Sequence, residues 1–109
     1  MAITKEELKQ YTTNDDYLVR FILHALIRSE TKLGKKYNMV KKFFDTHPKE
    51  YRTTKELKMA NEYCLFMVNL KLSAYKEISR LTNHERADLL EYDDKLDNFL
   101  KNFKFEESR

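Results

Sequence analysis

The sequence predicts an all-α protein, a compact bundle of four to five helices with the fourth helix at its centre. One glycine and one proline among 109 residues argue against turn-rich β architectures and against glycine-rich phosphate loops. The helix-favouring residues Leu, Lys and Glu dominate instead. In three places a threonine precedes a glutamate by three residues, which is the spacing of a capping box at a helix start. These pairs are Thr4 with Glu7, Thr53 with Glu56, and Thr82 with Glu85.

The first two helices are expected over residues 5–11 and 14–32. Thr13 with Asp16 forms a weaker capping box for the second helix, because aspartate stands where glutamate or glutamine is usual. From residue 17 to residue 27 only an arginine and a histidine are polar, so this helix is expected to be largely buried.

A third helix is expected over residues 35–46. Gly34 would separate it from the second helix as a left-handed C-cap. Lys32 would then lie near the C-terminal, negative end of the second helix's dipole, where a cation is stabilising. One continuous helix through Gly34, at a cost of about 1 kcal/mol, is the competing interpretation. Pro48 would end this part of the chain, because the residue before a proline is pushed out of the helical conformation.

The fourth and fifth helices are expected over residues 54–80 and 84–104. The stretch Tyr63–Val68 is apolar on every side of the fourth helix, which predicts a central place for that helix. The fifth helix has a single apolar stripe at helical spacing, typical of a surface helix. The stripe consists of Leu89, Tyr92, Leu96, Phe99 and Phe103.

We expect a single helical domain over residues 1–109, with residues 1–3 and 105–109 frayed. The longest apolar run, residues 63–68, is far shorter than the ~20 residues that span a bilayer. The first residues lack the apolar segment of a signal peptide. A cytoplasmic protein that does not contact a membrane is therefore expected.

Nothing in the sequence points to catalysis, so no enzyme, cofactor or metal site is expected. The single cysteine, Cys64, excludes an internal disulfide and a cysteine-cluster zinc site, and its apolar surroundings predict a buried, inert thiol. A run of acids near the C-terminus lacks the loop spacing and glycine of a calcium site and is interpreted as a solvated face. The run consists of Glu85, Asp88, Glu91, Asp93, Asp94 and Asp97.

The net charge of +3 conceals a polarity along the chain. Residues 28–59 contain 10 basic and 4 acidic side chains, a net charge of +6, whereas residues 83–109 contain 5 basic and 8 acidic side chains, a net charge of −3. A basic surface of this kind attracts acidic partners or phosphates. Candidate contact residues are Arg20, His24 and Arg28, at i, i+4 and i+8 on one helix face, together with Lys32, Lys35, Lys36, Lys41 and Lys42.

These features predict a small non-enzymatic interaction protein that binds a protein or other macromolecular partner through its basic surface. The alternative of a DNA- or RNA-binding regulator would use a helix-turn-helix with its turn at Leu33-Gly34 and a lysine-rich second helix. Lysine outnumbers arginine there, whereas proteins that read bases or grip phosphate with two bonds favour arginine.

The first third of the chain resembles the small helical head–tail connector proteins of tailed phages. The resemblance rests on the segment Ile3–Lys9 (ITKEELK) and on Asp15-Asp16 opening an apolar helix, and it does not extend beyond Thr31. It implies a third alternative, an oligomeric structural subunit.

Overall fold

The computed structural model describes residues 4–47 and 53–106, and these form six α-helices and no strand. The all-α class is therefore confirmed. The expectations for residues 1–3, for residues 107–109 and for Pro48 lie outside the described residues. The helices are α1 (Lys5–Thr12), α2 (Asp15–Arg28), α3 (Lys32–Thr46), α4 (Thr54–Ser79), α5 (Asn83–Glu91) and α6 (Asp93–Lys101).

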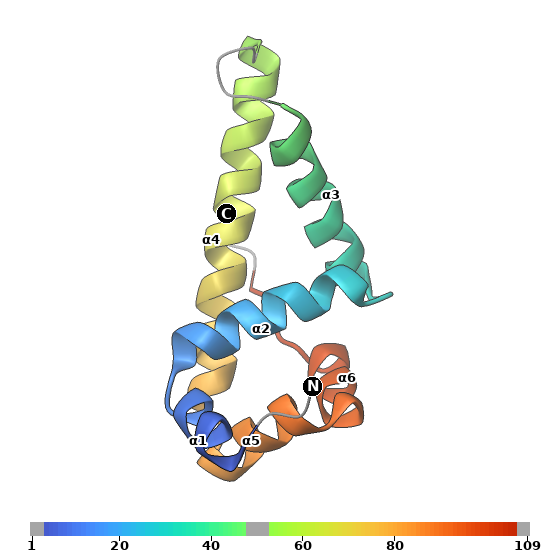
Figure 1. Ribbon diagram of the computed structural model, residues 1–109. Coiled ribbons are helices and arrows are strands. Elements are labelled where there is room, and N and C mark those ends of the chain that lie inside the picture. Colours follow the sequence, from blue (N-terminus) through green and yellow to red (C-terminus); the bar gives the residue numbers. More distant parts are fainter. Residues whose placement is uncertain (1–3, 48–52, 107–109) are drawn as a thin grey trace.

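The long helix α4 forms one edge of the molecule, and α2 packs across its C-terminal half (Figure 1). Helix α3 returns from the end of α2 toward the start of α4, while α1, α5 and α6 gather at the other end. A helix of 26 residues is about 39 Å long. It accounts for most of the 49 Å length of the molecule. The radius of gyration of 15.6 Å exceeds the roughly 13 Å of a spherical domain of this size, so the bundle is more elongated than the sequence predicts.

The core is built around α2. Leu18, Ile22 and Leu26, at i, i+4 and i+8, have no exposed surface, so one continuous stripe of this helix is enclosed. Complete burial of each such side chain stabilises the fold by about 1.5–3 kcal/mol. The stripe packs in one cluster with Val40 of α3, Leu70, Ala74 and Ile78 of α4, and Leu96 and Leu100 of α6.

Three helix starts follow their predicted capping residues. The hydroxyl groups of Thr4, Thr53 and Thr82 each accept a hydrogen bond from the backbone N–H three residues later, at 3.1–3.2 Å. The start of α2 differs from the prediction. Asn14, not Thr13, caps it through a 3.1 Å bond from the Tyr17 N–H. Thr13 instead donates its hydroxyl to the last turn of α1.

Both predictions for Gly34 are wrong, because α2 ends at Arg28 and α3 begins at Lys32. Gly34 lies in the first turn of α3, where its N–H donates to Oγ1 of the capping Thr31 at 3.0 Å, and its φ is not positive. A Cβ at this position would lie 2.6 Å from the Leu26 carbonyl oxygen. Glycine is therefore needed for close contact between α3 and the end of α2. Lys32 stands at the positive end of the α3 dipole, opposite to the prediction.

The predicted fifth helix is two helices, α5 and α6, separated by an extended residue. Tyr92 has φ −119° and ψ 118°, and its side chain is 48% exposed instead of continuing the predicted stripe. The break lets α6 fold back against α5, which buries Leu89 and Leu96 on two different helices. Packing between α5 and α6 thus stabilises the fold more than one uninterrupted amphipathic helix would.

The apolar stretch of α4 predicts that this helix is enclosed on all sides, but it is not. Phe66 and Leu70 are buried, whereas Leu65 and Val68 are 57% and 52% exposed. Cys64 is exposed as well, so the prediction of a buried thiol is wrong. Helix α4 is therefore buried on one side only, and several apolar side chains on its other side contact solvent.

Residues 105 and 106, predicted to be frayed, are attached to α4. The ring of Phe105 packs edge-on against Phe66 with centroids 5.2 Å apart. The Glu106 N–H donates to Ser73 Oγ at 3.3 Å, and the Glu106 carboxylate lies 2.9 Å from Lys76 Nζ. This short tail therefore packs against α4 at Phe66, Ser73 and Lys76.

The two faces of α4 predict opposite results for leucine truncation. Leu70→Ala should lower the free energy of unfolding by about 2–5 kcal/mol, because it leaves a cavity in the core. Leu72→Ala, at a position 61% exposed two residues away, should change the free energy by less than about 0.5 kcal/mol. Urea denaturation measures both. Equal losses would show that Leu72 is buried in solution.

The junction of α2 and α3 predicts that Gly34→Ala destabilises the protein, although alanine is the better helix former. The added methyl group would crowd two backbone carbonyls at 2.6 and 2.7 Å. Overpacking of this kind costs about 1–3 kcal/mol, against a gain of about 1 kcal/mol in helix propensity. Thermal and urea denaturation measure the difference. The exposed neighbour Lys35→Ala is the control, and a G34A protein as stable as the wild type would contradict the close contact.

Candidate functional site

The candidate residues of α2 lie along its exposed edge. Arg20, His24 and Arg28 are all exposed, while the helix positions between them contribute to the core. Within the described residues none of the three forms an ion pair. Arg28 borders a pocket of about 220 Å³ whose opposite wall carries Asp93 and Asp97 of α6. Arg28 and two carboxylates of α6 therefore border the same small pocket.

Three of the candidate lysines share one exposed strip of α3. Lys32, Lys35 and Lys42 stand at i, i+3 and i+10, and Met39 at i+7 lies between them with 53% of its surface exposed. In the part of the chain that the structure describes, no acidic side chain pairs with these lysines. We call Lys32, Lys35, Met39 and Lys42 the lysine face of α3.

The other two candidate lysines do not belong to this face. Lys36 turns toward α4, where its Nζ lies 4.7 Å above the centre of the Phe66 ring, a cation–π contact. Lys41 is exposed, but it stands about 100° around the helix from Lys42. The sequence could not separate inward from outward lysines, because the long lysine stem can cover apolar surface while its amine stays near water.

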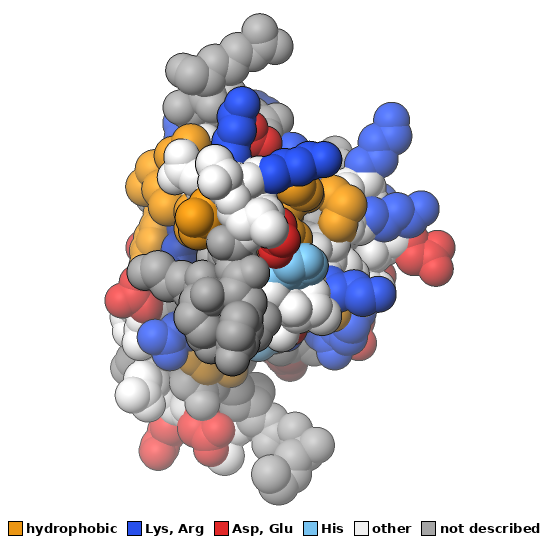
Figure 2. Space-filling view, turned by 90° about the horizontal axis from the view of Figure 1, so that it is seen from above, with side chains coloured by type: hydrophobic (Ala, Val, Ile, Leu, Met, Phe, Trp, Pro, Cys, Tyr) orange, Lys and Arg blue, Asp and Glu red, His pale blue; other side chains and the backbone are white. Residues whose placement is uncertain are grey.

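The space-filling view from above shows two kinds of surface. Lys and Arg side chains gather on the side of α3 and the end of α2, whereas hydrophobic side chains gather on the side of α4 (Figure 2). Arg28 and Lys32 flank the same three-residue connection between α2 and α3, so the end of the α2 edge adjoins the start of the lysine face. The candidate cations of α2 and α3 thus adjoin one another at this connection.

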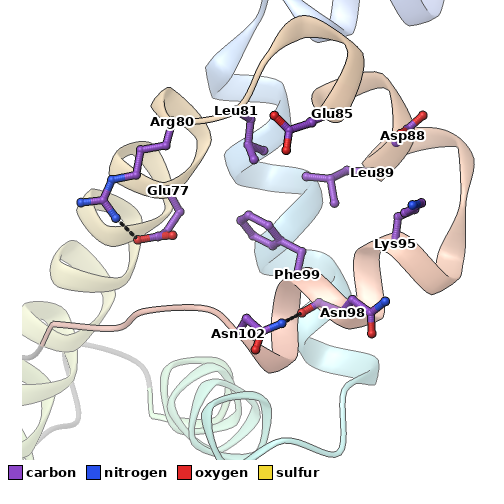
Figure 3. A pocket seen from close by; sticks show the side chains of 10 residues that line it. All are labelled: Glu77, Arg80, Leu81, Glu85, Asp88, Leu89, Lys95, Asn98, Phe99 and Asn102. Carbon is purple, nitrogen blue, oxygen red and sulfur yellow. Dashed lines mark hydrogen bonds and ion pairs between the residues drawn. The ribbon is translucent and has the colours of Figure 1, made fainter.

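A pocket of about 360 Å³ lies between the end of α4, α5 and α6. Leu81 of the α4–α5 turn, Leu89 of α5 and Phe99 of α6 point into it and form its apolar floor (Figure 3). Its charged margin is already paired in part: Glu77 accepts a 2.9 Å bond from Arg80, and Asp88 lies 3.7 Å from His84. Sequence analysis missed this pocket, because it exists only through the break at Tyr92.

Glu85 on this margin belongs to a complete capping box. The backbone N–H and the hydroxyl of Thr82 both lie 3.1 Å from its Oε1. These two hydrogen bonds, the backbone one first, hold the pKa of Glu85 below its ordinary value. The Glu85 carboxylate is therefore ionised at neutral pH, and its Oε1 is occupied by the hydrogen bonds that cap α5.

The residue types that could support catalysis or bind metal are dispersed. Within the described residues, no group of three His, Cys, Asp or Glu side chains is arranged to hold a metal ion. His47 stacks on Phe43 at 4.3 Å, at the end of α3. Exposed Cys64 has no hydrogen-bond partner among the described residues.

Among the described helices, none has both the length and the apolar character that crossing a bilayer requires. Comparison of the chain with protein-family models, with curated proteins and with solved structures finds no significant match.

The capping box predicts a measurable change in the titration of Glu85. Thr82→Ala removes the hydroxyl but keeps the backbone donor, so the pKa of Glu85 should rise part of the way toward its ordinary value. Because the folded-state pKa is lowered, the stabilisation is present above the unfolded pKa and is lost as the pH falls through the folded pKa. The difference in free energy of unfolding between the wild type and T82A should therefore become smaller at low pH.

NMR titration of the Glu85 side-chain carboxyl carbon measures this pKa. Thr54→Ala, which alters a threonine inside the first turn of α4, serves as the control and should leave the Glu85 titration unchanged. An unchanged Glu85 pKa in T82A would show that the hydroxyl does not bond to the carboxylate in solution.

Proposed function

We propose that the protein is a non-enzymatic interaction protein that binds an acidic partner protein through the lysine face of α3. The observation that carries this proposal is the placement of three exposed lysines, with no ion pair among the described residues, around one exposed methionine on a single helix strip. An exposed apolar side chain within a charged rim has the composition of a small binding centre.

The two kinds of side chain would contribute differently. The lysines favour encounter with an acidic surface and disfavour basic ones, so they would raise the association rate and the selectivity. Met39 supplies polarizable, adaptable contact area that becomes buried on binding. The attraction between exposed charges weakens as the ionic strength rises, whereas the contribution from burying Met39 is not screened by salt.

Nucleic acid is a second candidate partner, and one structural feature favours it. Helices α2 and α3 are joined by three residues, 29–31, and α3 presents lysines along its exposed strip, as the second helix of a helix-turn-helix would. The strip offers lysine and methionine but no arginine, so contact would be with phosphates and not with base edges. Such binding would fall steeply with salt concentration.

Charge reversal on the lysine face tests both candidates. In affinity capture from the native host, Lys35→Glu/Lys42→Glu should reduce the recovered partner at least tenfold, because it replaces attraction of an acidic surface by repulsion. Nuclease treatment of the captured material, and a mobility-shift assay with duplex DNA and RNA at low salt, distinguish a protein partner from a nucleic acid. Recovery lost after nuclease treatment would favour the nucleic-acid candidate.

The matched control is Lys95→Glu/Lys104→Glu, which makes the same change of charge at exposed positions in α6 and just after it, outside the lysine face. The amount of partner recovered with this control should equal that recovered with the wild type. Equal recovery with K35E/K42E and the wild type, both shown to be folded by circular dichroism, would overturn the proposed function.

A further inference from the structure

The outward side of α4 carries a row of large apolar side chains in contact with solvent. Leu57, Leu65, Val68 and Leu72 are 47%, 57%, 52% and 61% exposed, and we call these four residues the α4 ridge. They account for four of the six large hydrophobic side chains that are strongly exposed within the described residues. A contiguous apolar patch of this kind on a small soluble protein marks an interaction site.

The spacing of this row is that of a helix–helix seam. Asn61, Leu65, Val68 and Leu72 follow one another at intervals of 4, 3 and 4 residues, as the a and d positions of a heptad repeat do. The side chains that α4 directs into its own core occupy other heptad positions: Ala60, Phe66, Leu70 and Ala74. Helix α4 therefore has two apolar faces, and the second one fits a partner helix lying alongside it.

The margins of the α4 ridge are basic. Lys55, Lys58 and Lys71 are exposed beside it and form no ion pair among the described residues. Glu62 is the one exposed acidic side chain of α4. Three lysines against one glutamate favour an acidic occupant. A second copy of this chain would bring the same excess of positive charge to both sides of the interface.

The shape of the row favours a helix over a lipid surface. Helices that lie in a membrane interface have a broad apolar face that often includes Trp or Phe. The α4 ridge is narrow, is interrupted in its seam by Asn61, and has no aromatic member. A polar residue at one a or d position is typical of seams in which it sets the register between two helices.

We propose that the α4 ridge binds an acidic amphipathic helix of a partner protein. The partner helix lies along α4 with apolar side chains against Leu65, Val68 and Leu72 and with carboxylates against Lys58 and Lys71. This goes beyond the lysine face of α3, because the ridge lies on the other side of the molecule (Figures 1 and 2). The two surfaces could hold two partners, or two parts of one partner, at the same time.

Synthetic peptides test this proposal without knowledge of the partner. The probe is a three-heptad peptide with leucine at a and d and glutamate at e and g; a second peptide has lysine at e and g, and a third is a scrambled glutamate peptide. By fluorescence anisotropy, the glutamate peptide should bind the full chain at least tenfold more tightly than either control. Leu65→Ser/Leu72→Ser should weaken this binding at least tenfold without unfolding the protein, since both side chains are mostly exposed.

Matched variants separate this surface from the lysine face. K58E/K71E should reverse the preference between the glutamate and lysine peptides, whereas Met39→Ser and K35E/K42E should leave it unchanged. Retention of peptide binding in K35E/K42E, together with loss of the partner captured by the lysine face, would show two independent sites.

Several results would overturn the proposal. These are equal affinity for the glutamate and lysine peptides, or unchanged binding by the L65S/L72S variant. Binding to phosphatidylserine vesicles without binding to the glutamate peptide would assign the ridge to a membrane surface. Light scattering that shows a dimer abolished by L65S/L72S, with no peptide binding, would assign it to a second copy.

Discussion

The enclosed stripe of α2 is the constraint on which the rest of the structure depends. Leu18, Ile22 and Leu26 have no solvent contact, and they can be covered completely only if several helices meet on one side of α2. Helices α3, α4 and α6 provide that cover, and Gly34 lets the first turn of α3 approach the end of α2 closely enough to do so. The direction of α3, and with it the outward side of its lysines, follows from this contact.

The same packing explains why apolar surface remains on α4. A helix of 26 residues is longer than the elements that cover it, and Leu65, Val68 and Leu72 on its other side stay exposed. The tail at Phe105 and Glu106 extends this cover without closing it. The molecule therefore presents a charged strip on α3 and an apolar, lysine-margined ridge on α4 in different directions, and both arise from one core.

Local signals in the sequence predicted the helix starts well where the cap was a threonine followed by glutamate. They failed where two caps competed, since Asn14 rather than Thr13 begins α2. They failed again where packing decides the outcome. Gly34 resembles a helix terminator in isolation, and Tyr92 resembles a member of a continuous stripe. Close contact with α2 places the first inside a helix, and burial of Leu89 and Leu96 on separate helices places the second at a break.

Composition and local spacing alone determined the all-α class, the positions of most helices and the separation of basic from acidic segments. These properties depend on backbone propensity, capping and charge, all of which act within a few residues along the chain. Only the tertiary structure decided which side chains face outward. Lys36 lies against Phe66 while Lys35 is exposed, and Leu70 is buried while Leu72 is not. Exposure depends on the elements that pack against a helix, and residues distant in the sequence determine that packing.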